Sequence, residues 1–223
     1  MKNKILISLC AVLAICCIVL SFCLASIKGE SESDHDTSKA SGTLPVQAAA
    51  TSGDIQFKLS LLHLYYESQQ LVSTLPYATV QITYAALIKA FMTDSSAVSA
   101  AVEYLNKYVD KQVMSAYDSM DEILSKYQAV LKKYNISSSS SYNAKYNNLK
   151  TVFDSLKNSS VELISRTRSL ILVSHSSNYD SSYTLYNEQL ADLTSKIQSA
   201  VVNITNEYEA LLAEISSDYD MIK

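Results

Sequence analysis

The chain has 223 residues, enough for one domain with a substantial core, and a formal net charge of −4. Its three glycines all precede residue 54 and it holds only two prolines, so a β-rich fold, whose turns need these residues, is excluded and long helices joined by short loops are favoured. The mild acidic charge, without a basic cluster, argues against a nucleic acid as partner.

An uninterrupted apolar run covers residues 5–25, directly after a basic start that contains Lys2 and Lys4. The length of the run suits an N-terminal membrane anchor, which needs ~20 apolar residues, whereas the small residues near Ala25 suit a signal peptide cleaved at that point. Both alternatives place the rest of the chain outside the cytoplasm, either held at the membrane or secreted. All four cysteines lie within this run, so no disulfide is expected in the remaining chain.

Small and polar residues without periodicity fill residues 26–53 and predict a flexible linker. A helical domain is expected over residues 54–223. Residues 55–91 form its first part, of which residues 55–75 are apolar on more than one side, which predicts burial against several neighbours. Pro76 lies within this part and is expected to kink or break the helix, because proline lacks the backbone N–H and clashes with the preceding turn.

The clearest helical pattern runs from Ser95 to Tyr134. Its apolar and aromatic residues recur at steps of three and four, which keeps them on one side of a single long helix. A second row beside this seam widens it to the stripe that a helix in a bundle needs. The seam consists of Val102, Leu105, Val109, Val113, Ala116, Met120, Ile123, Tyr127, Val130 and Tyr134.

Two further seams cover residues 141–174 and 183–222, and serine-rich turns at residues 137–141 and 176–182 separate the segments. Short connections make neighbouring helices antiparallel. The predicted fold class is therefore all-α: an antiparallel bundle of about four long helices, the first kinked at Pro76, with coiled-coil-like packing. A dimer of helical hairpins would bury the same seams, so a homo-oligomer remains an alternative.

No pattern in the chain predicts catalysis, a cofactor or a metal site. His63 and Glu67 stand four apart on a helix, as two metal ligands can, but no second motif supplies further ligands. We therefore interpret His63 as a buried or half-buried structural residue. The acidic residues near Asp121, and those from Glu207 to Glu214, lie mainly off the apolar seams and are expected to be solvated. An enzyme is not expected.

Four residues are candidate contacts for a ligand or partner. Arg166 and Arg168 are the only arginines, and a guanidinium can bind a carboxylate or phosphate through two hydrogen bonds. Pairing with acidic residues of a neighbouring helix is the other interpretation of these two. His175 and Tyr179 belong to a polar loop, where functional side chains often gather, although a turn built from capping residues explains the same letters.

Asn135 begins an Asn-Ile-Ser sequon beside the serine run and is a candidate glycosylation site in a host that glycosylates secreted proteins. Two other sequons occur in the chain, and the context of Asn135 next to a predicted loop fits a glycan best. Use of this site depends on the host.

The chain holds 16 tyrosines, and those off the apolar seams should be exposed, where tyrosine supplies a large contact area at low entropic cost. We therefore expect a non-catalytic extracytoplasmic binding protein that contacts another protein or a component of the cell envelope. A membrane-active bundle, lipid-binding or pore-forming, is the alternative, because long amphipathic helices without disulfides can lay their apolar sides on a bilayer. The ligand-binding ectodomain of a sensor-like system is a second alternative, by analogy of shape alone.

Overall fold

Helices and short turns account for residues 52–92, 96–174 and 176–222, which are the residues that the computed structural model describes. No strand occurs among them, so the predicted all-α class is confirmed. They belong to one compact unit, Ala48–Lys223. The predicted N-terminal anchor or signal peptide lies outside the described residues, as does the predicted linker up to residue 51.

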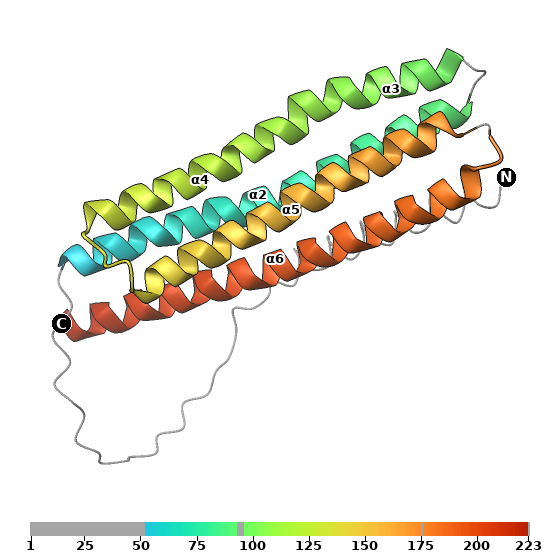
Figure 1. Cartoon of the computed structure of the whole chain (residues 1–223). Helices are drawn as coiled ribbons and strands as arrows, with labels where there is room; N and C mark the ends of the chain where they lie inside the picture. Colours follow the sequence, from blue (N-terminus) through green and yellow to red (C-terminus); the bar gives the residue numbers. More distant parts are fainter. Residues whose placement is uncertain (1–51, 93–95, 175, 223) are drawn as a thin grey trace, which may run out of the picture. The chain divides into compact units, whose positions relative to one another are not determined.

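Helix α2 (Ser52–Met92) runs through Pro76 without ending there (Figure 1). The sequence predicts a kink or a break at this proline, and a break does not occur. The helix continues because Val72 before the proline and Val80 after it are buried in the same core, which holds the two halves of the helix together. The helix contacts each of the other helices of the unit.

The segment predicted as one long helix is divided into α3 (Ser96–Tyr108), a π-helical turn η1 (Val109–Val113) and α4 (Met114–Lys133). The buried residues explain the division, because Ala101, Leu105, Val113 and Tyr117, with the half-buried Val109 between them, follow a row with steps of four. In an α-helix such a row drifts by about 40° per step, since one turn holds 3.6 residues. The wider π turn takes up this drift and keeps both halves against the core.

Helices α5 (Ser141–Leu172) and α6 (Tyr179–Ile222) complete the unit. Ser160 and Thr167 of α5 are polar but buried, and the Thr167 hydroxyl donates a hydrogen bond to the Leu163 carbonyl at 2.7 Å, which satisfies it within its own helix. All the helices contribute to one core. The largest fully buried side chains are Tyr65, Tyr127, Tyr186, Phe153, Leu61, Leu105, Met120, Leu156, Leu163, Leu170 and Ile171.

Polar side chains join helices at matching levels. From α2 to α6, Lys58 Nζ lies 2.7 Å from Asp218 Oδ2, and further along α2 the Gln69 amide donates to the Thr205 hydroxyl at 2.8 Å.

Candidate binding face

The outer side of α2 carries a continuous row of exposed side chains, which we call the α2 face. Between Leu59 and Ile88, every exposed residue that the structure describes belongs to this row, at steps of three and four apart from one step of seven that spans the half-buried Tyr84. None of them is Asp, Glu, Lys or Arg. The row consists of Leu59, His63, Tyr66, Gln70, Thr74, Tyr77, Gln81 and Ile88.

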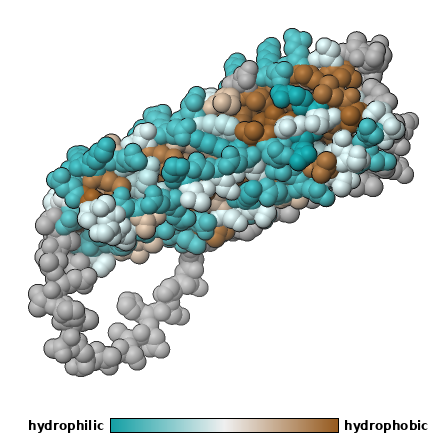
Figure 2. Space-filling view, viewed as in Figure 1, coloured by the Kyte–Doolittle hydropathy of each residue, from teal (hydrophilic) through white to brown (hydrophobic). Residues whose placement is uncertain are grey.

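The exposed side of α4 is different, because it carries many charges. In the view of Figure 2, polar side chains cover most of α4, and apolar ones gather near α3. Depletion of charge is what distinguishes the centre of a protein interface from ordinary surface, so the α2 face is the stronger candidate for binding. The exposed charged residues of α4 are Asp118, Asp121, Glu122, Lys126, Lys132 and Lys133.

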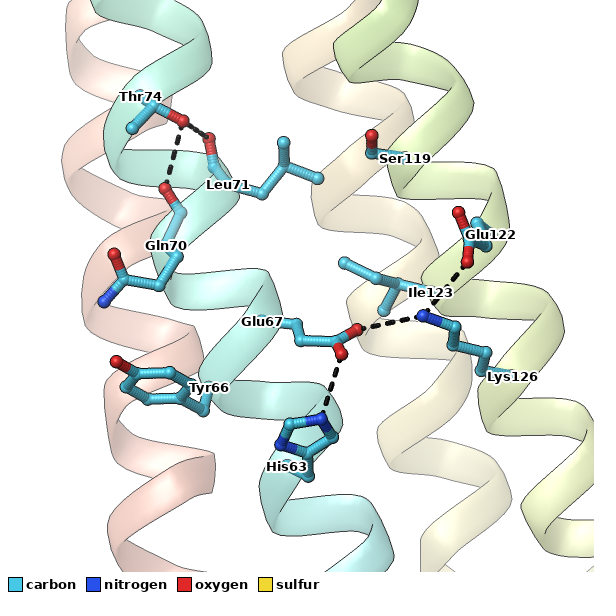
Figure 3. A pocket seen from close by; sticks show the side chains of 10 residues that line it. All are labelled: His63, Tyr66, Glu67, Gln70, Leu71, Thr74, Ser119, Glu122, Ile123 and Lys126. Atoms are coloured by element: carbon cyan, nitrogen blue, oxygen red, sulfur yellow. Dashed lines mark hydrogen bonds and ion pairs between the residues drawn. The ribbon is translucent and has the colours of Figure 1, made fainter.

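A groove of about 470 Å³ lies along the α2 face, between α2 and α4. Tyr66, Gln70 and Thr74 line it from the α2 face, and Figure 3 shows Leu71 and Ile123 reaching in from the two helices. The groove therefore combines an apolar floor with phenol, amide and hydroxyl groups. Such a lining can bind another molecule by apolar contact and by neutral hydrogen bonds.

Glu67 links both walls of the groove (Figure 3). His63 Nε2 lies 3.0 Å from one of its carboxylate oxygens and Lys126 Nζ lies 3.4 Å from the other. Lys126 also lies 3.0 Å from Glu122, and the hydrogen bond to Glu122, together with the charge of Glu67, raises the pKa of Lys126 above its ordinary value. Lys126 of α4 thus pairs with one carboxylate from each wall, and Glu67 is the charged residue that α2 brings to the groove lining.

The position of His63 corrects the interpretation from the sequence. Its side chain is 71% exposed and not buried, because it belongs to the outer row of α2 and pairs with Glu67 one turn further along. Among the described residues no cluster of three metal-binding side chains occurs.

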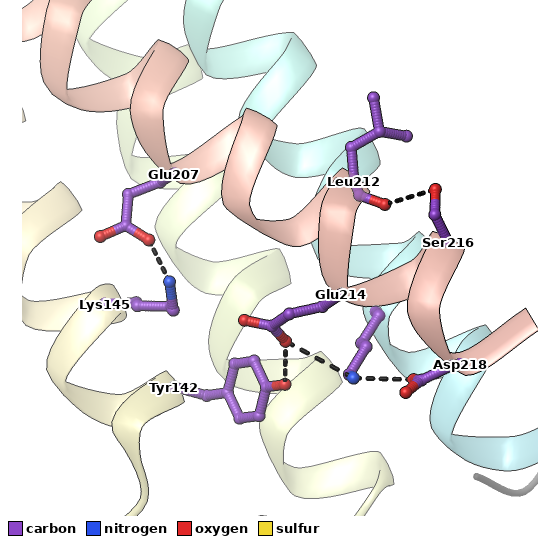
Figure 4. A network of polar contacts seen from close by, with 8 residues as sticks. Tyr142, Lys145, Glu207, Leu212, Glu214, Ser216 and Asp218 are labelled. Atoms are coloured by element: carbon purple, nitrogen blue, oxygen red, sulfur yellow. Dashed lines mark hydrogen bonds and ion pairs between the residues drawn. The ribbon is translucent and has the colours of Figure 1, made fainter. Parts of the chain in front are cut away.

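A second polar cluster joins α2, α5 and α6 (Figure 4). Lys58 Nζ lies between Asp218 and Glu214, and the Tyr142 hydroxyl donates to Glu214 at 2.8 Å. Lys145 forms an ion pair with Glu207 in the same region. Glu207 and Glu214 were expected to be solvated; their side chains are 24% and 38% exposed, and each pairs with a lysine of another helix.

Burial acts on the groups of this second cluster. Burial alone would lower the pKa of Lys58, but the hydrogen bond and charge of Asp218, supported by Glu214, outweigh it and raise the pKa above its ordinary value. Burial and the hydrogen bond to the Glu214 carboxylate raise the pKa of Tyr142. The cluster holds three helices together, which is a structural task.

The candidate contacts from the sequence lie elsewhere. Arg166 Nε pairs with Glu162 of its own helix at 2.7 Å, and Arg168 donates to the neutral amide oxygen of Asn106 on α3 at 2.8 Å. Among the described residues, neither arginine thus pairs with a carboxylate of a neighbouring helix: Arg166 pairs within α5, and Arg168 bonds a neutral amide of α3.

Tyr179, another candidate contact, is half-buried. Its ring centroid lies 5.7 Å from that of Tyr183, with the rings stacked, and 5.3 Å from that of Phe91, edge to face. The fourth candidate, His175, lies outside the described residues. None of the described candidates lines the groove.

Asn135 is exposed and ends α4 with a φ of 54°, a left-handed conformation that asparagine tolerates better than most residues. Its N–H bonds the Lys132 carbonyl at 3.1 Å, and the N–H of Ile136 bonds the Leu131 carbonyl at 3.0 Å. The helix end thus gives this asparagine a structural role, and its use as a glycosylation site stays a prediction.

Comparison with protein-family models, curated proteins and solved structures finds no match to the chain. The site is therefore argued from its own residues. Reasoning from the sequence missed the α2 face, although a signal exists: between Lys58 and Lys89 the only charged residue is Glu67. We read this long uncharged stretch as buried on several sides, whereas its outer row, including Leu59 and Tyr66, is exposed.

Proposed function

We propose that the chain is a non-catalytic, extracytoplasmic binding protein, anchored at the membrane or released, whose α2 face contacts another protein or a component of the cell envelope. The observation that carries this proposal is the exposed, uncharged α2 face with its groove. Tyr66 and Tyr77 are 50% and 47% exposed on this face. Exposed tyrosines flanked by neutral polar groups are typical of surfaces that bind proteins.

The proposed architecture of this protein is the antiparallel bundle expected from the sequence. The pairs Lys58 with Asp218 and Gln69 with Thr205 support opposite directions for α2 and α6. For α4 and α5, Lys157 donates to Asp121 at 2.6 Å and Gln128 donates to the Tyr146 hydroxyl at 2.7 Å, again with one helix rising as the other descends. In such a bundle α2 presents its outer row along the whole length of the domain.

The chemistry of the face suits a partner with a neutral surface. Each exposed tyrosine ring offers apolar area, whose burial contributes roughly 25 cal/mol per Å². The amides of Gln70 and Gln81 can donate and accept hydrogen bonds with backbone or side-chain groups of a partner. Glu67 and Lys126 line the groove as an ion pair that connects its two walls.

Site-specific photo-cross-linking tests the proposal. The full chain is made with a photoreactive phenylalanine analogue at Gln70, in the α2 face, and as a matched control at Gln198, an exposed glutamine of α6. Cross-linked products in the producing cells are expected for position 70 and not for position 198. Equal yields at both positions, or none at position 70, would contradict the α2 face as the binding surface.

Membrane activity is the second candidate function, and one observation favours it. Residues 52–91 of α2 are long and apolar enough to cross a membrane by length and composition, with 44% of the most apolar window buried in the unit. Co-sedimentation of the protein with neutral and anionic vesicles, together with dye release, tests this candidate. Binding to vesicles with release of the dye would favour membrane activity. If the folded protein stays in solution, the binding function is favoured instead.

A further inference from the structure

We propose that the α2 face binds the same face of a second copy of the chain, so that two copies form an antiparallel dimer with two-fold symmetry. This inference rests on the proposed function, because it names the partner of the α2 face. It starts from the order of the exposed residues along α2.

The α2 face is self-complementary about a point between Ser73 and Thr74. When a second α2 lies antiparallel across this point, residues equally far from it on the two helices stand at the same level. Leu59 then meets Ile88, Tyr66 meets Gln81 and Gln70 meets Tyr77. Each apolar residue at an end meets an apolar one, and each tyrosine meets a glutamine.

Two-fold symmetry makes every one of these pairs occur twice. An interface of this kind uses the same patch on both copies. It is complete once two copies have bound, so it yields a dimer and does not continue into a filament. At the centre, Ser73 of one copy stands at the level of Thr74 of the other, and both side chains are small. Small residues at a crossing point allow two helices to approach closely.

The groove supplies a shape that fits this arrangement. Gln70 and Thr74 line the groove, and Tyr77 of the second copy stands at their level. Tyr77 is 47% exposed and can enter the groove beside the apolar side chains of Leu71 and Ile123. Each copy offers one tyrosine and one groove, so both grooves are filled in a single dimer.

The residues of the face favour a protein over a lipid bilayer as the occupant. Gln70, Thr74 and Gln81 are polar and recur along the row, and a hydrocarbon environment would leave their amides and hydroxyl without partners outside the helix. A second copy offers the phenol hydroxyls and amides that satisfy them. The absence of charge also removes the like-charge repulsion that two identical surfaces ordinarily meet.

A stable contact needs the surface of α4 as well as that of α2. The row spans about 44 Å at 1.5 Å per residue, and with a helix width of ~10 Å it covers about 440 Å² of each copy. Stable interfaces bury about 800 Å² per partner. The α4 wall of the groove extends the contact beyond α2 through the half-buried Ser119 and the exposed Glu122 and Lys126.

Charge exchange at Thr74 tests the dimer without touching the core. Within the described part of the chain, the Thr74 hydroxyl donates to carbonyls of its own helix, at Gln70 and Leu71, so we expect substitution here to leave the fold intact. In the full chain in detergent micelles, Thr74→Lys and Thr74→Glu should each raise the dimer dissociation constant at least tenfold, because like charges meet at the two-fold axis. An equimolar mixture of the two variants should restore dimerisation, and thermal melts of both should match that of the unsubstituted chain.

Cross-linking tests the antiparallel register. All four native cysteines, within residues 5–25, are replaced by serine, and single cysteines are introduced as Leu59→Cys or Ile88→Cys. A short bis-maleimide should link the two variants when they are mixed, and neither variant to itself. Leu172→Cys, at an exposed leucine of α5, is the matched control and should not cross-link.

The outcomes separate this inference from the proposed function. Self-linking of Leu59→Cys, a monomer at all concentrations, or no rescue by the mixed Thr74 variants would overturn the antiparallel dimer. If a monomer is found while the photoreactive group at Gln70 links a different protein, the dimer is wrong and the binding function stands. If vesicles alone protect the α2 face, both are wrong.

Discussion

Lys58 and Asp218 form an ion pair of 2.7 Å although 160 residues separate them in the chain. The pair connects the beginning of α2 with the end of α6, and Asp218 is only 8% exposed. Glu214 lies 3.5 Å from the same ammonium group and accepts a hydrogen bond from Tyr142 of α5. One lysine thus joins three helices at this end of the unit.

Removing the charge of Asp218 should weaken the domain measurably. Asp218→Asn leaves Lys58 half-buried with a weaker partner, so we expect the free energy of unfolding to fall by about 1–3 kcal/mol. Asp154→Asn is the matched control, because its pair with Lys150 is exposed and should contribute less than about 0.5 kcal/mol. Urea unfolding of both variants measures the difference. Equal losses of unfolding free energy would mean that the buried pair stabilises the domain no more than the exposed one.

Tyr65 should be replaceable by phenylalanine without loss. Its side chain is 1% exposed, and among the described residues its hydroxyl has no partner in hydrogen-bond geometry. Tyr65→Phe removes a buried polar group that makes no bond, so the unfolding free energy should stay within about 1 kcal/mol or rise. Tyr127→Phe is the control that should lose about 1 kcal/mol, since the Tyr127 hydroxyl donates to the Tyr142 carbonyl at 3.3 Å. A large loss in Tyr65→Phe would reveal a bond that this structure lacks.

Alkaline pH should destabilise the domain through its buried tyrosines. Burial raises the pKa of Tyr65 and of Tyr127 above the ordinary value of 10.0. A group whose pKa is raised by folding contributes its stability below the pKa of the unfolded chain and loses it as the pH rises toward the folded value. The melting temperature should therefore be constant near neutral pH and fall above about pH 10. Tyr65→Phe should make this fall of the melting temperature with pH shallower. An unchanged fall would show that the burial of Tyr65 does not contribute to the pH dependence.

The π turn predicts an unusual tolerance to deletion. A π turn holds one residue more than an α turn, so removing the exposed Gln112 from η1 lets the turn become α-helical. Removing the exposed Ser125 from α4 should instead rotate the buried residues on one side of it by about 100° relative to the other. We expect a cooperative thermal melt, followed by circular dichroism, for the first deletion and none for the second. The reverse result would show that the π turn is required for the fold.

Periodicity in the sequence was sufficient to predict much of the core. Met120 and Tyr127 of the predicted seam are fully buried, because helical spacing depends only on the geometry of the backbone. The π turn was not predicted, since single steps of four also occur in ordinary helices. Only the longer row from Ala101 to Tyr117 shows that several such steps follow one another.

The candidate site was harder to predict because residue type does not determine which side of a helix is covered. His63 and Tyr66 lie among leucines in the sequence, but they stand on the outer row of α2 and are exposed. Glu214 is paired between helices because Lys58, far away in the chain, reaches it. Such long-range partners leave no local pattern, so Arg166 and Arg168 were preferred over the α2 face.

The most direct test of the α2 face as a binding surface is the accessibility of position 74 in the producing cells. In the chain with the native cysteines replaced, Thr74→Cys and the control Ser125→Cys, both at exposed residues, are treated with a membrane-impermeant maleimide before and after denaturation. A covered α2 face predicts labelling of the control in intact cells and protection of position 74 until denaturation. Equal and immediate labelling at both positions would contradict the proposed function.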